Sequence, residues 1–251
     1  MDQAEIESSI LATYRSSACR YRRDDVLHVT GEDHQRLCHL LRILSSSFGR
    51  PIKALDVGCG TGRYFHCLRG TRSLVGLDLC EEMLEQARHP VKEDEVSVED
   101  IELVRGSLYN QVFPAESFDL IYSIGVFGNG CGLGGDLFSR FYTWLAPGGH
   151  IFFDVIDSSG LPRALKWRVW LRKLFSNICP DWLSRFVGKG QTEPVPLHTY
   201  SRDGIITLLE SHGFFVVAVY PQECQMPLGP GKKLQCLGVK PLKRESESGR
   251  A

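Results

Sequence analysis

The sequence predicts an α/β protein with a mostly parallel sheet and helices on both faces. Apolar runs of four to six residues alternate with helical stretches between residues 52 and 155, a pattern typical of βαβ units. A glycine-rich turn, residues 58–62, follows the first apolar run. The length of 251 residues allows one or two domains of this kind.

The first half of the chain opens with two expected helices, over residues 1–13 and 32–47. Four leucines between residues 37 and 44 recur at helical spacing, and Arg50-Pro51 ends that segment because the residue before proline avoids helical geometry. Acidic residues open the expected helix over 81–88, where the helix dipole favours them. The order predicted between these two helices is strand 52–57, helix 63–68 and strand 73–77.

The second half continues the alternation. Residues 114–117 are turn-like and precede an expected strand over 118–123, while Pro147-Gly148-Gly149 forms a turn before the strand over 150–155. The other expected elements are strands over 101–104, 214–220 and 234–239 and helices over 136–145 and 202–211.

The composition argues against several classes of protein. The net charge is −1, with 29 basic and 30 acidic residues, which disfavours a generally basic nucleic-acid binder. The longest uncharged stretch, residues 120–135, contains six glycines and is shorter than the roughly 20 apolar residues that a membrane span needs. The acidic start is unlike a secretory signal. We therefore expect no transmembrane segment.

Nine cysteines are scattered along the chain without a C-x-x-C pair. Zinc sites and disulfide frameworks usually show closer pairing. We therefore expect mostly buried free thiols, no metal site and a reducing compartment, with the cytoplasm as the default location.

The strongest motif is the turn at residues 58–62, between an expected strand and an expected helix. Glycines there allow sharp turns and the close approach of a ligand, and ligands of such sheets bind beyond the carboxyl ends of the strands. Asp78 ends the next strand, 22 residues after Asp56. A carboxylate about 20 residues on commonly accepts ribose hydroxyls, so an adenosine-containing ligand is expected.

The spacing of the glycines disfavours a nicotinamide dinucleotide. The dinucleotide fingerprint G-x-G-x-x-G/A would place its third small residue at Arg63, whereas the third glycine here is Gly62. A nicotinamide-dependent oxidoreductase nevertheless stays an alternative.

Several segments together resemble class I S-adenosylmethionine-dependent methyltransferases. The residues that carry the resemblance are Leu55-Asp56-Val57-Gly58-Cys59-Gly60-Thr61-Gly62, Val75-Gly76-Leu77-Asp78 with Met83-Leu84, Phe118-Asp119-Leu120-Ile121-Tyr122-Ser123, Leu145-Ala146-Pro147-Gly148-Gly149, Tyr14-x-x-x-Ala18-x-x-Tyr21, and His198-x-Tyr200-Ser201. The resemblance implies a Rossmann-like fold with a seven-stranded sheet. It also implies N-terminal helices (1–50) covering the cofactor site, a core (51–157 and 191–241), a helical insertion (158–190) and a polar tail (242–251).

The resemblance implies S-adenosylmethionine as cofactor and a set of contacts for it. Asp56 would hold the amino group, Asp78 the ribose hydroxyls, Leu79 and Met83 the adenine, and Tyr21 the methionine end. The remaining expected contacts are Gly58, Cys59, Gly60, Thr61, Gly62, Ser107, Leu108, Ser123, Ile124 and Gly125. Ser107 stands where many members carry the Asp of Gly-Asp-Ala, and a neutral hydroxyl binds adenine more weakly than a carboxylate does.

Methyl transfer from a sulfonium is an in-line displacement that positioning can accelerate strongly. A general base is needed only when the acceptor keeps its proton at neutral pH. His198 and Tyr200 are the candidate catalytic residues, with Asp154 and Asp157 as weaker ones; a structural role for each stays open.

Residues 161–190 carry seven basic residues, one acidic residue and three of the four tryptophans. Their apolar residues recur at helical spacing between 167 and 178. The segment is expected to pack on the sheet edge, to act as a substrate lid, or to contact an anionic membrane surface.

We expect methyl transfer to a small, apolar or aromatic acceptor. A catalytically inactive methyltransferase-fold subunit and a nucleic-acid methyltransferase are further alternatives. The acceptor and the oligomeric state stay open.

Overall fold

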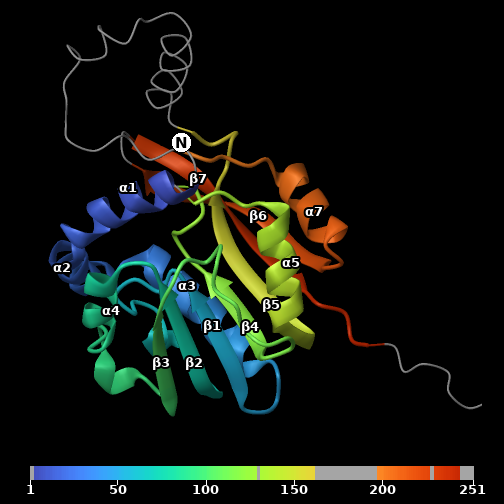
Figure 1. Ribbon diagram of the computed structural model, residues 1–251, viewed down its shortest axis with the longest axis horizontal. Helices are drawn as coiled ribbons and strands as arrows, with labels where there is room; N and C mark the ends of the chain where they lie inside the picture. Colours follow the sequence, from blue (N-terminus) through green and yellow to red (C-terminus); the bar gives the residue numbers. More distant parts are fainter. Residues whose placement is uncertain (1–2, 129–130, 162–196, 227–228, 244–251) are drawn as a thin grey trace, which may run out of the picture.

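The computed structural model describes residues 3–128, 131–161, 197–226 and 229–243 (Figure 1). The sheet has the strand order β3-β2-β1-β4-β5-β7-β6, and β7 runs antiparallel to both of its neighbours. The fold is therefore the expected mostly parallel, seven-stranded class I methyltransferase fold. The strands are β1 (Ile52–Val57), β2 (Thr71–Asp78), β3 (Asp100–Arg105), β4 (Phe118–Ser123), β5 (Leu145–Ile156), β6 (Phe215–Met226) and β7 (Gly229–Val239).

Helices cover both faces of this sheet, because successive apolar side chains of its strands point to opposite faces. Leu55 and Val57 of β1 join one cluster with α5 (Gly135–Trp144) and α7 (Arg202–Ser211). Ile52 and Ala54 join a second cluster with α3 (Glu32–Ser46), α4 (Glu81–Ala87) and the 3-10 turn η1 (Phe65–Cys67). A second short turn, η2 (Glu93–Glu95), follows α4.

Two further helices, α1 (Gln3–Arg15) and α2 (Ala18–His28), contact α4 (Figure 1). Helix α2 was not predicted, because its Arg- and Asp-rich sequence shows no clear apolar stripe. It is held by the buried Asp25 and by the packing of Ala18 and Tyr21 in a small apolar cluster with Cys80 and Met83.

Several sequence-based boundaries were wrong. The helix expected over 63–68 is only the turn η1. Strand β5 includes the predicted turn at Pro147-Gly148-Gly149, with an irregularity in its pairing to β4. Strands β6 and β7 reach beyond the expected ranges, because they pair with each other as a long antiparallel hairpin.

The expectation of free thiols does not hold for one pair of cysteines. Cys38 of α3 and Cys67 of η1 are joined by a disulfide. The free cysteines among the described residues are Cys19, Cys59, Cys80, Cys131, Cys224 and Cys236.

Within the described ranges, every helix is too short or too polar to cross a bilayer. The predicted helix within 161–190 lies, apart from Leu161, outside the described residues.

Candidate functional site

The loop after β1 is fastened to the end of β2. The two strands are parallel, with Val57 paired to Leu77, so their carboxyl ends meet at one edge of the sheet. The N–H groups of Gly58 and Cys59 both donate to Leu77 O, at 2.7 and 3.0 Å. These backbone hydrogen bonds fix the start of the loop to the end of β2.

Asp78 organises this edge through its carboxylate. Oδ2 accepts the Gly60 N–H at 2.8 Å, and Oδ1 accepts the Cys80 N–H at 2.9 Å. A carboxylate offers about four acceptor sites. Both oxygens can thus hold the loop and still accept hydrogen bonds from a ligand.

Gly60 forms an open cradle in the loop. Its φ of +55° lies in the left-handed region, and a Cβ built there would meet no atom within 4 Å. Gly62 has no such open space, because a Cβ built there would lie 2.8 Å from the Phe65 ring. Gly60 leaves room for a ligand, whereas Gly62 is a glycine for packing reasons.

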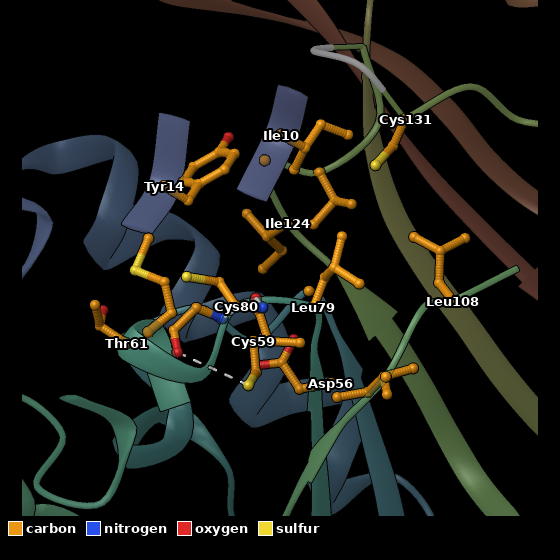
Figure 2. A pocket seen from close by; sticks show the side chains of 18 of the residues that line it. Ile10, Tyr14, Asp56, Cys59, Thr61, Leu79, Cys80, Leu108, Ile124 and Cys131 are labelled. Atoms are coloured by element: carbon orange, nitrogen blue, oxygen red, sulfur yellow. Dashed lines mark hydrogen bonds between the residues drawn. The ribbon is translucent and has the colours of Figure 1, made fainter. Parts of the chain in front are cut away.

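A cavity of about 260 Å³ opens above the loop. Figure 2 shows Tyr14 and Ile10 of α1 on one side and Asp56 and Cys59 on the other. Most of the predicted cofactor residues line it: Tyr21, Asp56, Gly58, Cys59, Gly60, Thr61, Asp78, Leu79, Met83, Ser107, Leu108, Ile124 and Gly125.

Two predicted cofactor residues do not line the cavity. Gly62 packs against Phe65 and Pro90. Ser123 is buried, and its hydroxyl donates to Val57 O at 2.8 Å. Neither residue lines the cavity, and a direct contact of either with the cofactor stays a prediction.

The candidate catalytic residues His198 and Tyr200 also lie outside the cavity lining. The Tyr200 hydroxyl accepts the Leu133 backbone N–H at 2.6 Å, and the backbone N–H of His198 donates to Gly128 O at 2.8 Å. Both residues hold the segment between β4 and α5. Their geometry supports a positioning role, and their catalytic role stays a prediction.

Asp154 and Asp157 likewise hold backbone. Asp154 accepts the Gly125 N–H at 2.6 Å and pairs with Lys233 at 2.7 Å. Asp157 accepts the Ser159 N–H at 2.8 Å. Asp154 thereby fixes Gly125, which does line the cavity.

Sequence reasoning expected N-terminal helices over the site but did not identify the residues of α1 that line the cavity. Glu7 accepts the Ser107 hydroxyl at 2.6 Å, and both residues line the cavity. A contact across 100 positions has no signature in the sequence. Tyr14 belongs to a motif noted above, and its hydroxyl pKa is raised by burial. The other unpredicted lining residues are Ile10, Arg63, Tyr64, Leu77, Cys80, Gly106, Tyr109, Val126 and Cys131.

A buried carboxylate ties α2 to the glycine loop. Asp25 is fully buried; it accepts the Thr61 hydroxyl and forms an ion pair with Arg63. Because buried charges require partners, this contact fixes the N-terminal helices over the cavity.

Burial shifts the acidity of the carboxyls in the cavity. It raises the pKa of Asp56 to about 8, with the negative charge of Asp78 adding to the rise. Burial also raises the pKa of Asp78, opposed by the backbone N–H groups that it accepts. A cationic ligand group near Asp56 would reverse part of this shift.

Comparison with known proteins agrees with this geometry. A family model described as a methyltransferase domain matches residues 55–153. Residues 55–153 thus match a methyltransferase domain, within a sheet that has the class I S-adenosylmethionine-dependent methyltransferase fold. S-adenosylmethionine is accordingly its cofactor, and the nicotinamide alternative falls away.

Individual relatives are distant. Sterol 24-C-methyltransferase of Debaryomyces hansenii is 29% identical over 136 residues, which cover 51% of this chain and 33% of that protein. The match thus spans about a third of the length of this curated relative.

Solved structures with similar folds cover nearly all of the chain. Magnesium protoporphyrin IX methyltransferase of Synechocystis PCC 6803, solved with S-adenosylhomocysteine (SAH), has a TM-score of 0.64 at 13% identity, covering 94% of this chain and 99% of that one. Burkholderia thailandensis 1,6-didemethyltoxoflavin-N1-methyltransferase has a TM-score of 0.57 at 18% identity, covering 96% and 91%. These likenesses concern the fold.

Residues of this chain fit S-adenosylmethionine. Asp78 keeps acceptor capacity for two ribose hydroxyls, and Gly60 offers open space at the loop. The ionisable Asp56 lies in the same cavity for an ammonium group.

Proposed function

We propose that this protein transfers the methyl group of S-adenosylmethionine to a small apolar or aromatic acceptor. The observation that carries the proposal is the Asp78–Gly60 contact at the floor of a cavity closed by α1 and α2. The bound cofactor supplies an activated methyl group with a neutral leaving group. The rest of the rate enhancement must come from how the chain binds and orients the cofactor and the acceptor.

Residues at the ends of the cavity divide the task of holding the cofactor. Asp78 accepts the ribose hydroxyls, and Asp56 faces the ammonium group. Arg63, which forms an ion pair with the buried Asp25, contributes positive potential near the carboxylate of the cofactor's methionine portion. Opposite charges in a partly desolvated site attract more strongly than in water, so this end fixes the cofactor's orientation.

Glu7 takes the place of the carboxylate that the sequence lacks after β3. Its Oε1 already accepts a hydrogen bond from Ser107, and its remaining acceptor sites are available to the adenine amino group. Helix α1 would thus supply the contact that many family members draw from the segment after β3.

The character of the acceptor follows from the other cavity walls. Ile10, Tyr14, Ile124 and Cys131 line the cavity (Figure 2), and burial raises the Cys131 pKa to about 11, so that it stays a neutral thiol. Apolar walls favour an apolar or aromatic acceptor. The names of the relatives above, with sterol, porphyrin and toxoflavin acceptors, support a small molecule, and the net charge of −1 disfavours nucleic acid.

Catalysis would rest on alignment rather than on a side-chain nucleophile. Holding donor and acceptor in line can supply about 7–11 kcal/mol of the barrier. The carboxyls that line the cavity, Glu7, Asp56 and Asp78, are assigned above to holding the cofactor. A cytoplasmic location, inferred from the cysteines, stays a prediction, as do the roles of residues 158–190.

A methyl-labelling screen tests this function. The full chain is incubated with a metabolite extract and S-adenosylmethionine carrying a labelled methyl group, and labelled products are identified by mass. The expected result is a labelled small molecule with the wild-type chain and none with Asp78→Ala. A chain that binds SAH but labels nothing, over a range of extracts, would favour the inactive-subunit alternative.

A further inference from the structure

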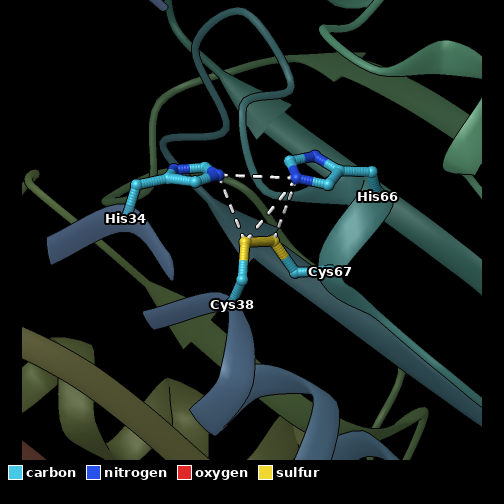
Figure 3. Close-up of side chains that lie close together, drawn as sticks. All are labelled: His34, Cys38, His66 and Cys67. Atoms are coloured by element: carbon cyan, nitrogen blue, oxygen red, sulfur yellow. Dashed lines mark hydrogen bonds between the residues drawn. A yellow bond between two sulfur atoms is a disulfide. The ribbon is translucent and has the colours of Figure 1, made fainter. Parts of the chain in front are cut away.

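Four buried side chains with metal-ligating atoms meet outside the cavity. His34, Cys38, His66 and Cys67 lie between α3 and η1, and their ligating atoms all lie within 4.8 Å of one another. The exposed fraction of each residue is 7% or less. Figure 3 shows the two imidazole rings pointing toward one another above the two sulfur atoms. None of the four lines the cofactor cavity.

Local structure explains why these residues converge. His34 and Cys38 are four positions apart in α3, which places them on one helix face. His66 and Cys67 are adjacent in the turn η1, which packs against α3. Two ligands from a helix and two from a tight turn form a compact set.

Four of the distances between ligand atoms match a tetrahedral site, whereas the two sulfur atoms are joined by the disulfide and must separate before both can bind one metal ion. Zinc–nitrogen bonds of about 2.05 Å and zinc–sulfur bonds of about 2.3 Å give tetrahedral edges of about 3.3 Å between nitrogens and about 3.6 Å between nitrogen and sulfur. Here His34 Nε2 and His66 Nε2 lie 3.4 Å apart. Cys38 Sγ lies 3.2 Å from His34 Nε2 and 3.7 Å from His66 Nε2, and Cys67 Sγ lies 3.6 Å from His66 Nε2.

The charge of the set also suits a divalent cation. Two thiolates and two neutral imidazoles would make the occupied site neutral overall. Buried charges are tolerated when they are paired or coordinate a metal. Cys₂His₂ is one of the ligand sets that structural zinc sites use, and it leaves no open position.

We propose that His34, Cys38, His66 and Cys67 form a structural site for Zn²⁺ that fills when the Cys38–Cys67 disulfide is reduced. A dithiol reductant gives two electrons and two protons to the disulfide and becomes a disulfide itself, leaving two thiols. Both thiols release their protons to solvent when Zn²⁺ binds. The metal then fastens α3 to η1, only a few residues beyond the glycine loop. This proposal departs from the sequence-based expectation of no metal site.

The test uses the full chain, reduced with excess dithiol, stripped with a chelator and freed of both without oxygen. Co²⁺ is titrated first, because thiolate ligation gives charge-transfer bands and tetrahedral geometry gives intense visible bands. Zn²⁺ is then added in competition, and bound metal is measured by elemental analysis. Variants are His34→Gln and Cys67→Ser, with Cys236→Ser as the matched control, since Cys236 is a buried thiol outside the cluster.

The expected result is about one Zn²⁺ per chain, displacing Co²⁺ and raising the Tm by roughly 5–10 °C at a free Zn²⁺ concentration 100-fold above Kd. His34→Gln and Cys67→Ser should lose the Co²⁺ bands, and Cys236→Ser should keep them. A folded, reduced wild-type chain without thiolate-to-cobalt bands overturns the proposal, even if the variants fail to fold. So does a disulfide that persists in excess dithiol.

Discussion

The backbone N–H of Gly60 donates to Asp78 Oδ2 at 2.8 Å, so the carboxylate that ends β2 also holds the loop that follows β1. Cys80 donates to the other oxygen. The ribose contact and the shape of the glycine loop therefore depend on one side chain. A ligand that binds Asp78 finds the loop already in place.

Gly60→Ala should weaken cofactor binding while leaving the fold intact. The left-handed φ of +55° costs a non-glycine residue about 1–2 kcal/mol, and the new methyl group would fill the open space at the loop. We expect a Tm lower by a few degrees and an SAH affinity at least tenfold weaker by calorimetry. Gly134→Ala is the control, because its Cβ also meets open space but its φ is −117°; an equal loss of affinity there would contradict the account.

Asp56→Asn should change the pH dependence of stability without ligand. The folded pKa of about 8 lies above the ordinary value of 3.8, so the contribution of Asp56 to the free energy of unfolding is fully present below about pH 4 and is lost as pH rises through 8. An asparagine does not titrate, so the variant does not lose this stability as pH rises. The variant should therefore gain stability relative to wild type between pH 5 and 9 in denaturant titrations, and parallel pH profiles would refute the assignment.

The same carboxyl should make cofactor binding pH-dependent. An ammonium group favours ionised Asp56, so binding releases a proton below about pH 8. Apparent SAH affinity for the wild type should rise with pH up to about 8 and then level off. Calorimetry in buffers of different ionisation enthalpy measures the released proton, which Asp56→Asn should abolish.

Asp25→Asn should destabilise the N-terminal helices. It leaves Arg63 without its buried partner and weakens the contact with Thr61. Breaking a buried pair costs about 3–5 kcal/mol; because 30% of the Arg63 side chain is exposed, we expect about 2–4 kcal/mol. Hydrogen exchange should increase over residues 18–28. Asp24→Asn, its neighbour on the same helix, should leave both readouts within experimental error.

Glu7→Gln should relax the selectivity for adenine. The wild type should bind SAH at least tenfold more tightly than S-inosylhomocysteine, in which an exocyclic carbonyl oxygen replaces the amino group and would face the Glu7 carboxylate. The variant should narrow this ratio because its amide can donate to that oxygen. Glu5→Gln is the control, because Glu5 is exposed on the same helix and lies outside the cavity. An unchanged affinity ratio in Glu7→Gln would show that Glu7 does not contact the adenine.

The sequence predicted the loop side of the site because its determinants are local. Gly58 and Gly60 lie in the loop after β1, and Asp78 is the last residue of β2. The carboxyl ends of neighbouring parallel strands meet at one edge of the sheet. The core strands were recognisable for the same reason, since their apolar runs are short and bounded by turns.

What escaped prediction depends on contacts between distant segments. Glu7 reaches Ser107 only because α1 packs over the carboxyl edge of the sheet. Cys38 and Cys67 meet across 29 positions because α3 packs against η1, and no spacing rule for ligand motifs describes a helix paired with a separate turn. Gly62 and Ser123 share motif positions with true lining residues but point into packed surroundings.

Calorimetric titration of the full chain with SAH, compared between wild type and Asp78→Ala, tests the central claim most directly. Asp100→Ala, an exposed carboxylate on the neighbouring strand β3, is the matched control. We expect one site per chain in the wild type and in Asp100→Ala, and an affinity at least 100-fold weaker in Asp78→Ala. A folded wild-type chain that does not bind SAH, or an Asp78→Ala variant that binds it as tightly as wild type does, would contradict it.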